Sequence, residues 1–201
     1  MIRVLLAEDQ AMVRGALSAL LSREKDIEVV AEVARGDEVV KAALAAQPDI
    51  ALLDIEMPGL DGLTAAQALQ NALPMCRSVI LTTFGRSGYL RRAMEGGAVG
   101  FLLKDAPASE LALALRRVMK GERVVDPDLA LTALSEGTNP LTNREREVLA
   151  ASLFGASLAE IAARLVLSEG TIRNHLSTAM QKLGAQNRME AALRAEQKGW
   201  L

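Results

Sequence analysis

The sequence predicts an α/β domain with five parallel strands, followed by a smaller domain made only of helices. Over the first 120 residues, short apolar runs alternate with segments of helical spacing, which is typical of repeated strand–helix units. Most of these apolar runs are nearly uninterrupted, as expected for strands that helices cover on both faces. Beyond about residue 140 only the helical spacing remains, and 201 residues are sufficient for two domains.

Five apolar runs and the segments that follow them account for the α/β domain. The predicted strands are residues 3–7, 28–33, 49–54, 78–83 and 100–104. Helical segments follow these runs, for example residues 11–21, 37–46 and 110–120. In the last of these, Leu111, Leu115 and Val118 recur at the spacing that places them on one helix face. We therefore expect residues 1–120 to form one domain.

The rest of the chain is predicted to be a linker, residues 121–139, and a helical domain, residues 140–201. The linker contains Pro127, Gly137 and one apolar patch, which indicates a short helix within it. The helical domain contains helix-start signals, in which side chains satisfy free backbone N–H groups. They are the capping boxes Thr142 with Glu145 and Ser157 with Glu160, and the cap Ser168. We expect a final helix over about residues 188–198.

The composition excludes several classes of protein. Half of the residues are hydrophobic and 24% are charged, which is the balance of a globular chain rather than a disordered one. Residues 1–137 contain 15 Lys+Arg against 19 Asp+Glu, whereas residues 138–201 contain 8 against 6, so a polyanion would meet the C-terminal part. The single cysteine excludes an internal disulfide framework. No apolar run is long enough for a membrane span or a signal peptide, and we expect a cytoplasmic protein.

Polar side chains follow the predicted strands at the point where each strand ends. In the order of the first, third, fourth and fifth strands, they are Glu8 with Asp9, then Asp54, Thr82 and Lys104. The carboxyl ends of parallel strands meet at one edge of a sheet, and ligands of such folds bind there. We therefore expect three carboxylates, a hydroxyl and an ammonium to converge at this edge.

Three clustered carboxylates would repel one another unless a cation lay between them. Hard oxygen ligands around a small site suit Mg²⁺, which leaves room for a phosphate oxygen. Beside the metal, Asp54 could attack phosphorus, with Lys104 as a second positive pole and Thr82 as a hydrogen-bond donor. The same residues also fit an Mg²⁺-dependent aspartyl phosphatase, in which a second carboxylate near the nucleophile, here Glu56, would be the acid/base. This alternative stays open.

The third helix of the helical domain has two distinct faces. Its apolar residues recur at the spacing of one buried face: Ile172, Leu176, Ala179 and Leu183. Arg173, Asn174 and Ser177 lie on another side, and Arg and Asn can form paired hydrogen bonds with guanine and adenine. With the short helix before it, this segment predicts a helix-turn-helix that binds double-stranded DNA. A signalling module whose helices bind protein would have similar faces and is the second alternative.

Four N-terminal motifs closely resemble the receiver domains of two-component response regulators. They are Ala7-Glu8-Asp9, Asp54 through Gly62, Leu81-Thr82-Thr83 and Gly100 through Asp105. The resemblance covers about residues 1–120 and implies a five-stranded flavodoxin-like fold. It also implies that the chain is not an enzyme, and that Asp54 accepts a phosphoryl group from a phosphohistidine on a sensor histidine kinase.

The same resemblance assigns roles to individual residues. It implies that Mg²⁺ is held by two carboxylates and one backbone carbonyl, with a third carboxylate assisting: Asp9, Asp54, the carbonyl of Glu56, and Glu8. Thr82 and Phe101 occupy the positions of the family's switch pair. On phosphorylation, Thr82 is expected to move toward the phosphate and Phe101 to swing inward.

The C-terminal motifs resemble the LuxR-type helix-turn-helix. They are residues 141–149, Glu160-Ile161-Ala162, Thr171 through His175, and Lys182-Leu183. Together with the receiver motifs, they make the chain similar to transcription factors of the NarL/FixJ type. The resemblance places base-reading residues at Arg173, Asn174 and Ser177. It implies that three further residues contact phosphates or support the helix: Thr171, His175 and Lys182.

We also expect the protein to act as a homodimer. One helix-turn-helix of this size offers too few contacts for tight specific binding, whereas two copies can read two half-sites. Phosphorylation is therefore expected to promote dimerisation and promoter binding.

Further motifs, among them Lys198-Gly199-Trp200, are similar to a Gram-positive regulator of membrane-lipid desaturation. Membrane-lipid genes are therefore one hypothesis for the target.

Overall fold

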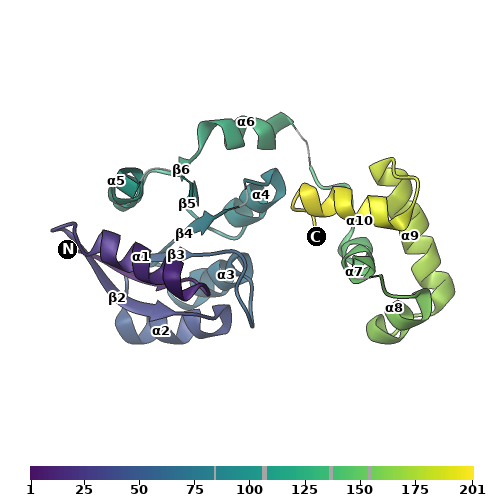
Figure 1. Cartoon of the computed structure of the whole chain (residues 1–201), viewed down its shortest axis with the longest axis horizontal. Helices are drawn as coiled ribbons and strands as arrows, with labels where there is room; N and C mark the ends of the chain where they lie inside the picture. The colour runs from purple at the N-terminus through teal and green to yellow at the C-terminus, as the bar shows by residue number, and fades with distance from the viewer. Residues whose placement is uncertain (84, 106–107, 136–137, 154) are drawn as a thin grey trace. The chain divides into compact units, whose positions relative to one another are not determined.

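The computed structural model describes all residues except 84, 106–107, 136–137 and 154. It contains two compact units, whose helices and strands are labelled in Figure 1. The α/β unit comprises Met1–Gly85 and Leu90–Thr132, and the helical unit comprises Ala133–Leu201 together with Arg86–Tyr89. The predicted fold class, an α/β domain followed by an all-helical domain, is confirmed.

The α/β unit is built on one parallel sheet with the strand order β2-β1-β3-β4-β5-β6. In chain order, the strands are β1 (Ile2–Ala7), β2 (Ile27–Val33), β3 (Ile50–Leu53), β4 (Arg77–Thr82), β5 (Gly100–Leu103) and β6 (Val124–Val125). The chain runs outward from β1 to β2 and then returns to β3 on the other side of β1. Such a reversal leaves a crevice beyond the carboxyl ends of β1 and β3.

The sheet has a sixth strand, so the predicted count of five is wrong. A turn at Gly121, whose φ is +88°, brings the chain back to the sheet edge. There Val124 and Val125 pair in parallel with Gly100 and Phe101 of β5. Two residues are too few for a strand pattern to be visible, and the sequence therefore indicates only a linker at this place. Helix α6 (Pro127–Ser135) is the short helix expected in this segment.

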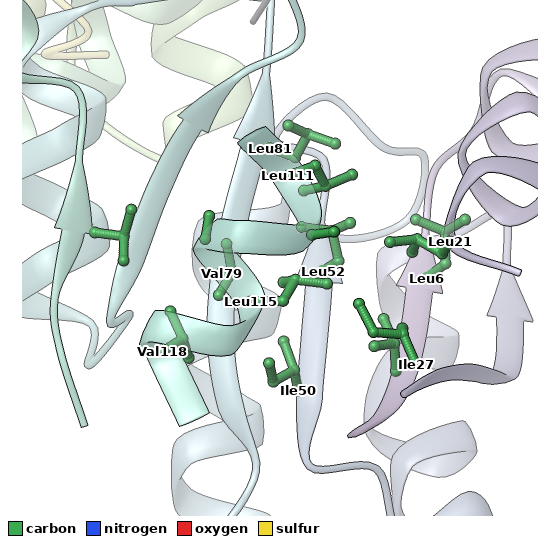
Figure 2. Close-up of a cluster of buried hydrophobic side chains, with 14 residues drawn as sticks. Leu6, Leu21, Ile27, Ile50, Leu52, Val79, Leu81, Leu111, Leu115 and Val118 are labelled. Carbon is green, nitrogen blue, oxygen red and sulfur yellow. The ribbon is translucent and has the colours of Figure 1, made fainter. Parts of the chain in front are cut away.

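Helices α1 (Ala11–Leu21) and α5 (Ala108–Met119) cover one face of the sheet. Alternate residues of the strands point toward this face, because successive side chains of a strand lie on opposite sides. Figure 2 shows the resulting apolar cluster, to which the strands and both helices contribute. Its most deeply buried members are Val4, Leu6, Leu21, Ile50, Leu52, Val79, Leu115 and Val118.

The strand residues between these, such as Leu5, Leu53 and Ile80, are equally buried. Helices α2 (Val39–Ala46) and α3 (Gly62–Ala72) contact each other and the strands β1, β2 and β4. Helix α4 (Ser87–Glu95) follows β4. The continuous apolar runs of the sequence therefore reflect strands buried on both faces, as predicted.

The helical unit contains α7 (Asn143–Ser152), α8 (Leu158–Leu165), α9 (Glu169–Leu183) and α10 (Arg188–Gln197). Both predicted capping boxes and the predicted cap of α9 are present. The four helices enclose a common core that includes Val148, Leu149, Ile161, Ile172, Leu176 and Ala191. Within the described residues, no helix combines the length and apolar character that a membrane crossing requires.

Two leucines of α5 provide a test of this packing. Leu115 is fully buried against the sheet, whereas Leu113 is 56% exposed. We expect Leu115→Ala to lower the free energy of unfolding by about 2–5 kcal/mol through lost burial and the cavity left behind. Leu113→Ala, the matched control, should change it by less than about 0.5 kcal/mol. Urea denaturation followed by circular dichroism measures both, and equal losses would contradict this packing.

Candidate functional site

Backbone hydrogen bonds continue the sheet past the strand ends and place polar residues side by side. The N–H of Asp54 donates to the carbonyl of Ala7 (2.9 Å), and the N–H of Lys104 donates to the carbonyl of Thr82 (2.8 Å). The strands β1, β3, β4 and β5 are consecutive in the sheet. The polar residues that end them, from Glu8 to Lys104, therefore share one edge.

Three carboxylates converge at this edge. Glu8, Asp9 and Asp54 each offer an oxygen that lies within 4.8 Å of the other two. Glu8 and Asp54 are only 1% and 6% exposed, while Asp9 is exposed. The ammonium of Lys104 lies 2.6 Å from a carboxylate oxygen of Glu8 and 3.1 Å from one of Asp54. It offsets part of the negative charge of the cluster.

Burial and neighbouring charges shift the protonation of these groups. Burial raises the pKa of both Glu8 and Asp54, although hydrogen bonds and charge from Lys104 act in the opposite direction. Burial disfavours the Lys104 ammonium, yet its hydrogen bond to Glu8 and the charge of Asp54 outweigh this effect and raise its pKa. A cation that entered beside Asp9 would favour the ionised carboxylates.

The two predicted switch residues are both completely buried. Thr82 ends β4, and Phe101 lies on the adjacent strand β5. The ring of Phe101 is thus already inside the domain, so the expected inward swing does not describe a change from this conformation. Glu56 lies in the loop after Asp54 with its side chain exposed, and the metal contact of its carbonyl stays a prediction.

Helix α9 presents one face to the core and another to solvent. Its buried residues are Ile172, Leu176 and Ala179. Five of the predicted DNA contacts lie on the remaining surface, three of them exposed and two half-buried: Arg173, Asn174, Ser177, Thr171 and His175. Lys182, the sixth, donates to both carboxylate oxygens of Glu145, at 2.7 and 2.9 Å. No spacing in the sequence indicates this partner.

Comparison with known families identifies the class of protein that combines such an acidic sheet edge with a helical domain of this kind. Residues 4–116 match the family profile of the response regulator receiver domain. The chain belongs to the response regulators. Residues 139–195 match the bacterial regulatory proteins of the luxR family, so this response regulator carries a luxR-type DNA-binding domain after its receiver.

Similar proteins match over the whole length. The response regulator is 46% identical over 200 residues to the transcriptional regulatory protein DesR of Bacillus subtilis (strain 168), covering 100% of this chain and 99% of that protein. It is 45% identical over 201 residues to the uncharacterized transcriptional regulatory protein YvfU of the same strain, covering 100% of both chains. A solved structure, the response regulator ChrA of a heme-sensing two-component system, matches with a TM-score of 0.58 and 37% identity, covering 100% of this chain and 98% of that chain.

Gly36 and Arg14 contact the loops that carry the acidic residues of the receiver, and no pattern in the sequence predicts these contacts. The N–H of Gly36 donates to the carbonyl of Pro58, and a Cβ on Gly36 would lie only 1.8 Å from the carbonyl oxygen of Leu60. This close approach holds the loop that follows Asp54. Arg14 donates to the backbone carbonyl of Glu8 (2.6 Å) and so holds the loop after β1. An isolated glycine or arginine has no spacing pattern, and only the folded chain shows these contacts.

The buried charges of the receiver can be tested through Lys104. We expect Lys104→Met to destabilise the receiver by about 3 kcal/mol without divalent cations, because two buried carboxylates lose their partner. Added Mg²⁺ should restore part of this loss by binding only the folded state. Arg117→Met is the matched control, since Arg117 pairs with Glu122 at the surface, and it should cost less than about 1 kcal/mol. Urea denaturation in EDTA and in MgCl₂ measures both variants; a loss that Mg²⁺ does not reduce would contradict the cation site.

The reading face of α9 can be tested through Arg173. If its guanidinium contacts a base, Arg173→Ala should relax the preference at one base pair by about 1–3 kcal/mol. Gln181 is exposed on the same helix, two turns further along, and Gln181→Ala is the control with unchanged preference. Sequencing of duplexes selected from a random library gives both results. Identical preferences for the wild type and Arg173→Ala would show that the reading face lies elsewhere.

Proposed function

We propose that this response regulator is a transcription factor that phosphorylation of Asp54 controls. The observation that carries the proposal is the cluster of Glu8, Asp9 and Asp54 at the open edge of the sheet, with Lys104 in contact with two of its members. This set of groups suits phosphoryl transfer, which requires positioning and charge neutralisation more than elaborate covalent chemistry. A protein that reads chromosomal DNA would act in the cytoplasm.

The carboxylate of Asp54 would act as the nucleophile. One of its oxygens forms the new P–O bond while the P–N bond of a phosphohistidine on a sensor histidine kinase breaks. The imidazole nitrogen leaves with the electron pair of that bond. Lys104 would balance negative charge beside Asp54, and the hydroxyl of Thr82, at the end of the next strand, would donate to a phosphoryl oxygen.

The donor set also fits Mg²⁺. Hard, partly exposed carboxylate oxygens within 4.8 Å of one another are the ligands that this ion prefers. Asp9, Asp54 and the backbone carbonyl of Glu56 would hold it, and Glu8 would assist. When bound, Mg²⁺ supplies positive charge that shields Asp54 from the incoming phosphate.

The output of the switch would be a homodimer on DNA. Thr82 and Phe101 lie on adjacent strands, so a movement of Thr82 toward a phosphate changes the packing around the buried ring. We propose that this change favours association of two chains, which then read two half-sites with Arg173, Asn174 and Ser177. The membrane-lipid target stays a prediction.

Phosphorylation can be measured directly with acetyl phosphate as a small phosphodonor. We expect intact-protein mass spectrometry to find one phosphoryl group per chain in the presence of Mg²⁺ and none for Asp54→Asn. Asp128→Asn, which changes an exposed aspartate of α6, should be phosphorylated like the wild type. Phosphorylated wild type should also elute as a larger species on size exclusion and bind DNA more tightly.

The same experiment separates the alternatives. An Mg²⁺-dependent aspartyl phosphatase would release phosphate continuously over many turnovers, whereas a regulator takes up a single group. A signalling module whose helices bind protein would be phosphorylated without any salt-dependent DNA binding. Phosphorylation of Asp54→Asn to the wild-type level would overturn the proposed acceptor.

A further inference from the structure

An ion pair between a buried carboxylate and a surface lysine joins the first turn of α7 to the last turn of α9. Glu145 is 4% exposed, although carboxylates are seldom buried so completely. Lys182, 37 residues further along the chain, donates to both of its carboxylate oxygens, at 2.9 and 2.7 Å. The lysine side chain itself is 31% exposed, so one member of the pair lies in the core and the other at the surface.

The carboxylate of Glu145 is satisfied from two sides. It accepts the backbone N–H of Thr142 at 2.7 Å, which completes the capping box of α7, and it accepts the ammonium of Lys182. Burial by itself would raise the pKa of Glu145, but Lys182 and Thr142 outweigh burial and lower it. Glu145 therefore stays ionised in the core and requires a cation beside it.

The position of Lys182 along α9 separates it from the reading residues. It lies nine residues after Arg173, which corresponds to about 13 Å along a helix axis. Ile172, Leu176 and Ala179 hold the middle of α9 against the core. Met180 and Leu183 pack against the core at the C-terminal end, and the ion pair adds a directional contact there.

We infer that Lys182 is a positioning residue, whose ion pair with Glu145 fixes the direction in which α9 presents Arg173 and Asn174 to DNA. The inference rests on the proposed function, because it concerns how that function's DNA contact is oriented. It assigns no phosphate contact to Lys182. It also gives Glu145, a buried residue of α7, an effect on DNA binding.

The salt dependence of DNA binding distinguishes positioning from phosphate contact. A lysine that neutralises one phosphate contributes about 0.9 to the slope of log affinity against log salt concentration. We expect full-length Lys182→Met to bind a duplex that the wild type selects from a random library more weakly than the wild type does, with an unchanged slope. Lys41→Met, the same substitution at an exposed site of α2, is the control for loss of one positive charge and should bind like the wild type.

Variants of the partner give a second readout. Glu145→Gln removes no positive charge, so it should weaken binding as Lys182→Met does if Lys182 acts through Glu145. A lysine that binds phosphate would instead be released by Glu145→Gln, and binding would tighten. Lys182→Arg keeps a cation and should retain most of the affinity. Lys182→Met should also lower the thermal midpoint of the helical domain more than Glu145→Gln does, because only Lys182→Met leaves a buried charge without its partner.

The double variant Glu145→Met with Lys182→Met covers the case in which a single variant does not fold. It replaces both charges by apolar groups of similar length, and it should bind DNA better than either single loss. A slope that falls by about 0.9 in Lys182→Met, or tighter binding by Glu145→Gln, overturns the inference and leaves the proposed function intact. A wild-type chain that has been phosphorylated with acetyl phosphate and still binds no duplex at low salt overturns the proposed function, and the inference with it.

Discussion

Negative charge crowded at the carboxyl edge of a parallel sheet is the constraint on which the receiver depends. Glu8 and Asp54 are almost completely buried, and Asp9 brings a third carboxylate within 4.8 Å of both. In such surroundings like charges repel strongly, and the two buried carboxylates, Glu8 and Asp54, also lose hydration. Lys104 relieves part of this cost by contacting two of the three. The residual negative charge is what makes the edge suitable for a divalent cation and, through it, for a phosphoryl group.

The order of the strands produces this crowding. Parallel strands end at the same edge, and residues that are distant in sequence meet there because the β1–β3 and β4–β5 ladders each continue one hydrogen bond past the strands. A core of doubly covered strands keeps that edge rigid, so the carboxylates cannot move apart to reduce their repulsion (Figure 2). Close approach at Gly36 and the bond from Arg14 then hold the two loops that carry the acidic residues.

The helical domain also buries a carboxylate whose charge has to be compensated. Its one nearly buried carboxylate within the described residues, Glu145, is compensated by a capping box and by Lys182. An ion pair of this kind contributes little net stability compared with apolar packing, but it is satisfied in a single geometry. That directional character suits a helix whose exposed residues have to meet a groove of DNA at a defined angle.

Much of this protein follows from local patterns in its sequence. The continuous apolar runs, both capping boxes, the cap of α9 and the polar residues at four strand ends are visible because each depends on neighbours or on a regular period. Tertiary structure alone decided the rest. β6 is too short to show a period, the ring of Phe101 is already buried, and Gly36 meets Leu60 across two loops. Lys182 finds Glu145 across 37 residues of chain, and no spacing rule connects residues whose proximity depends on how helices pack.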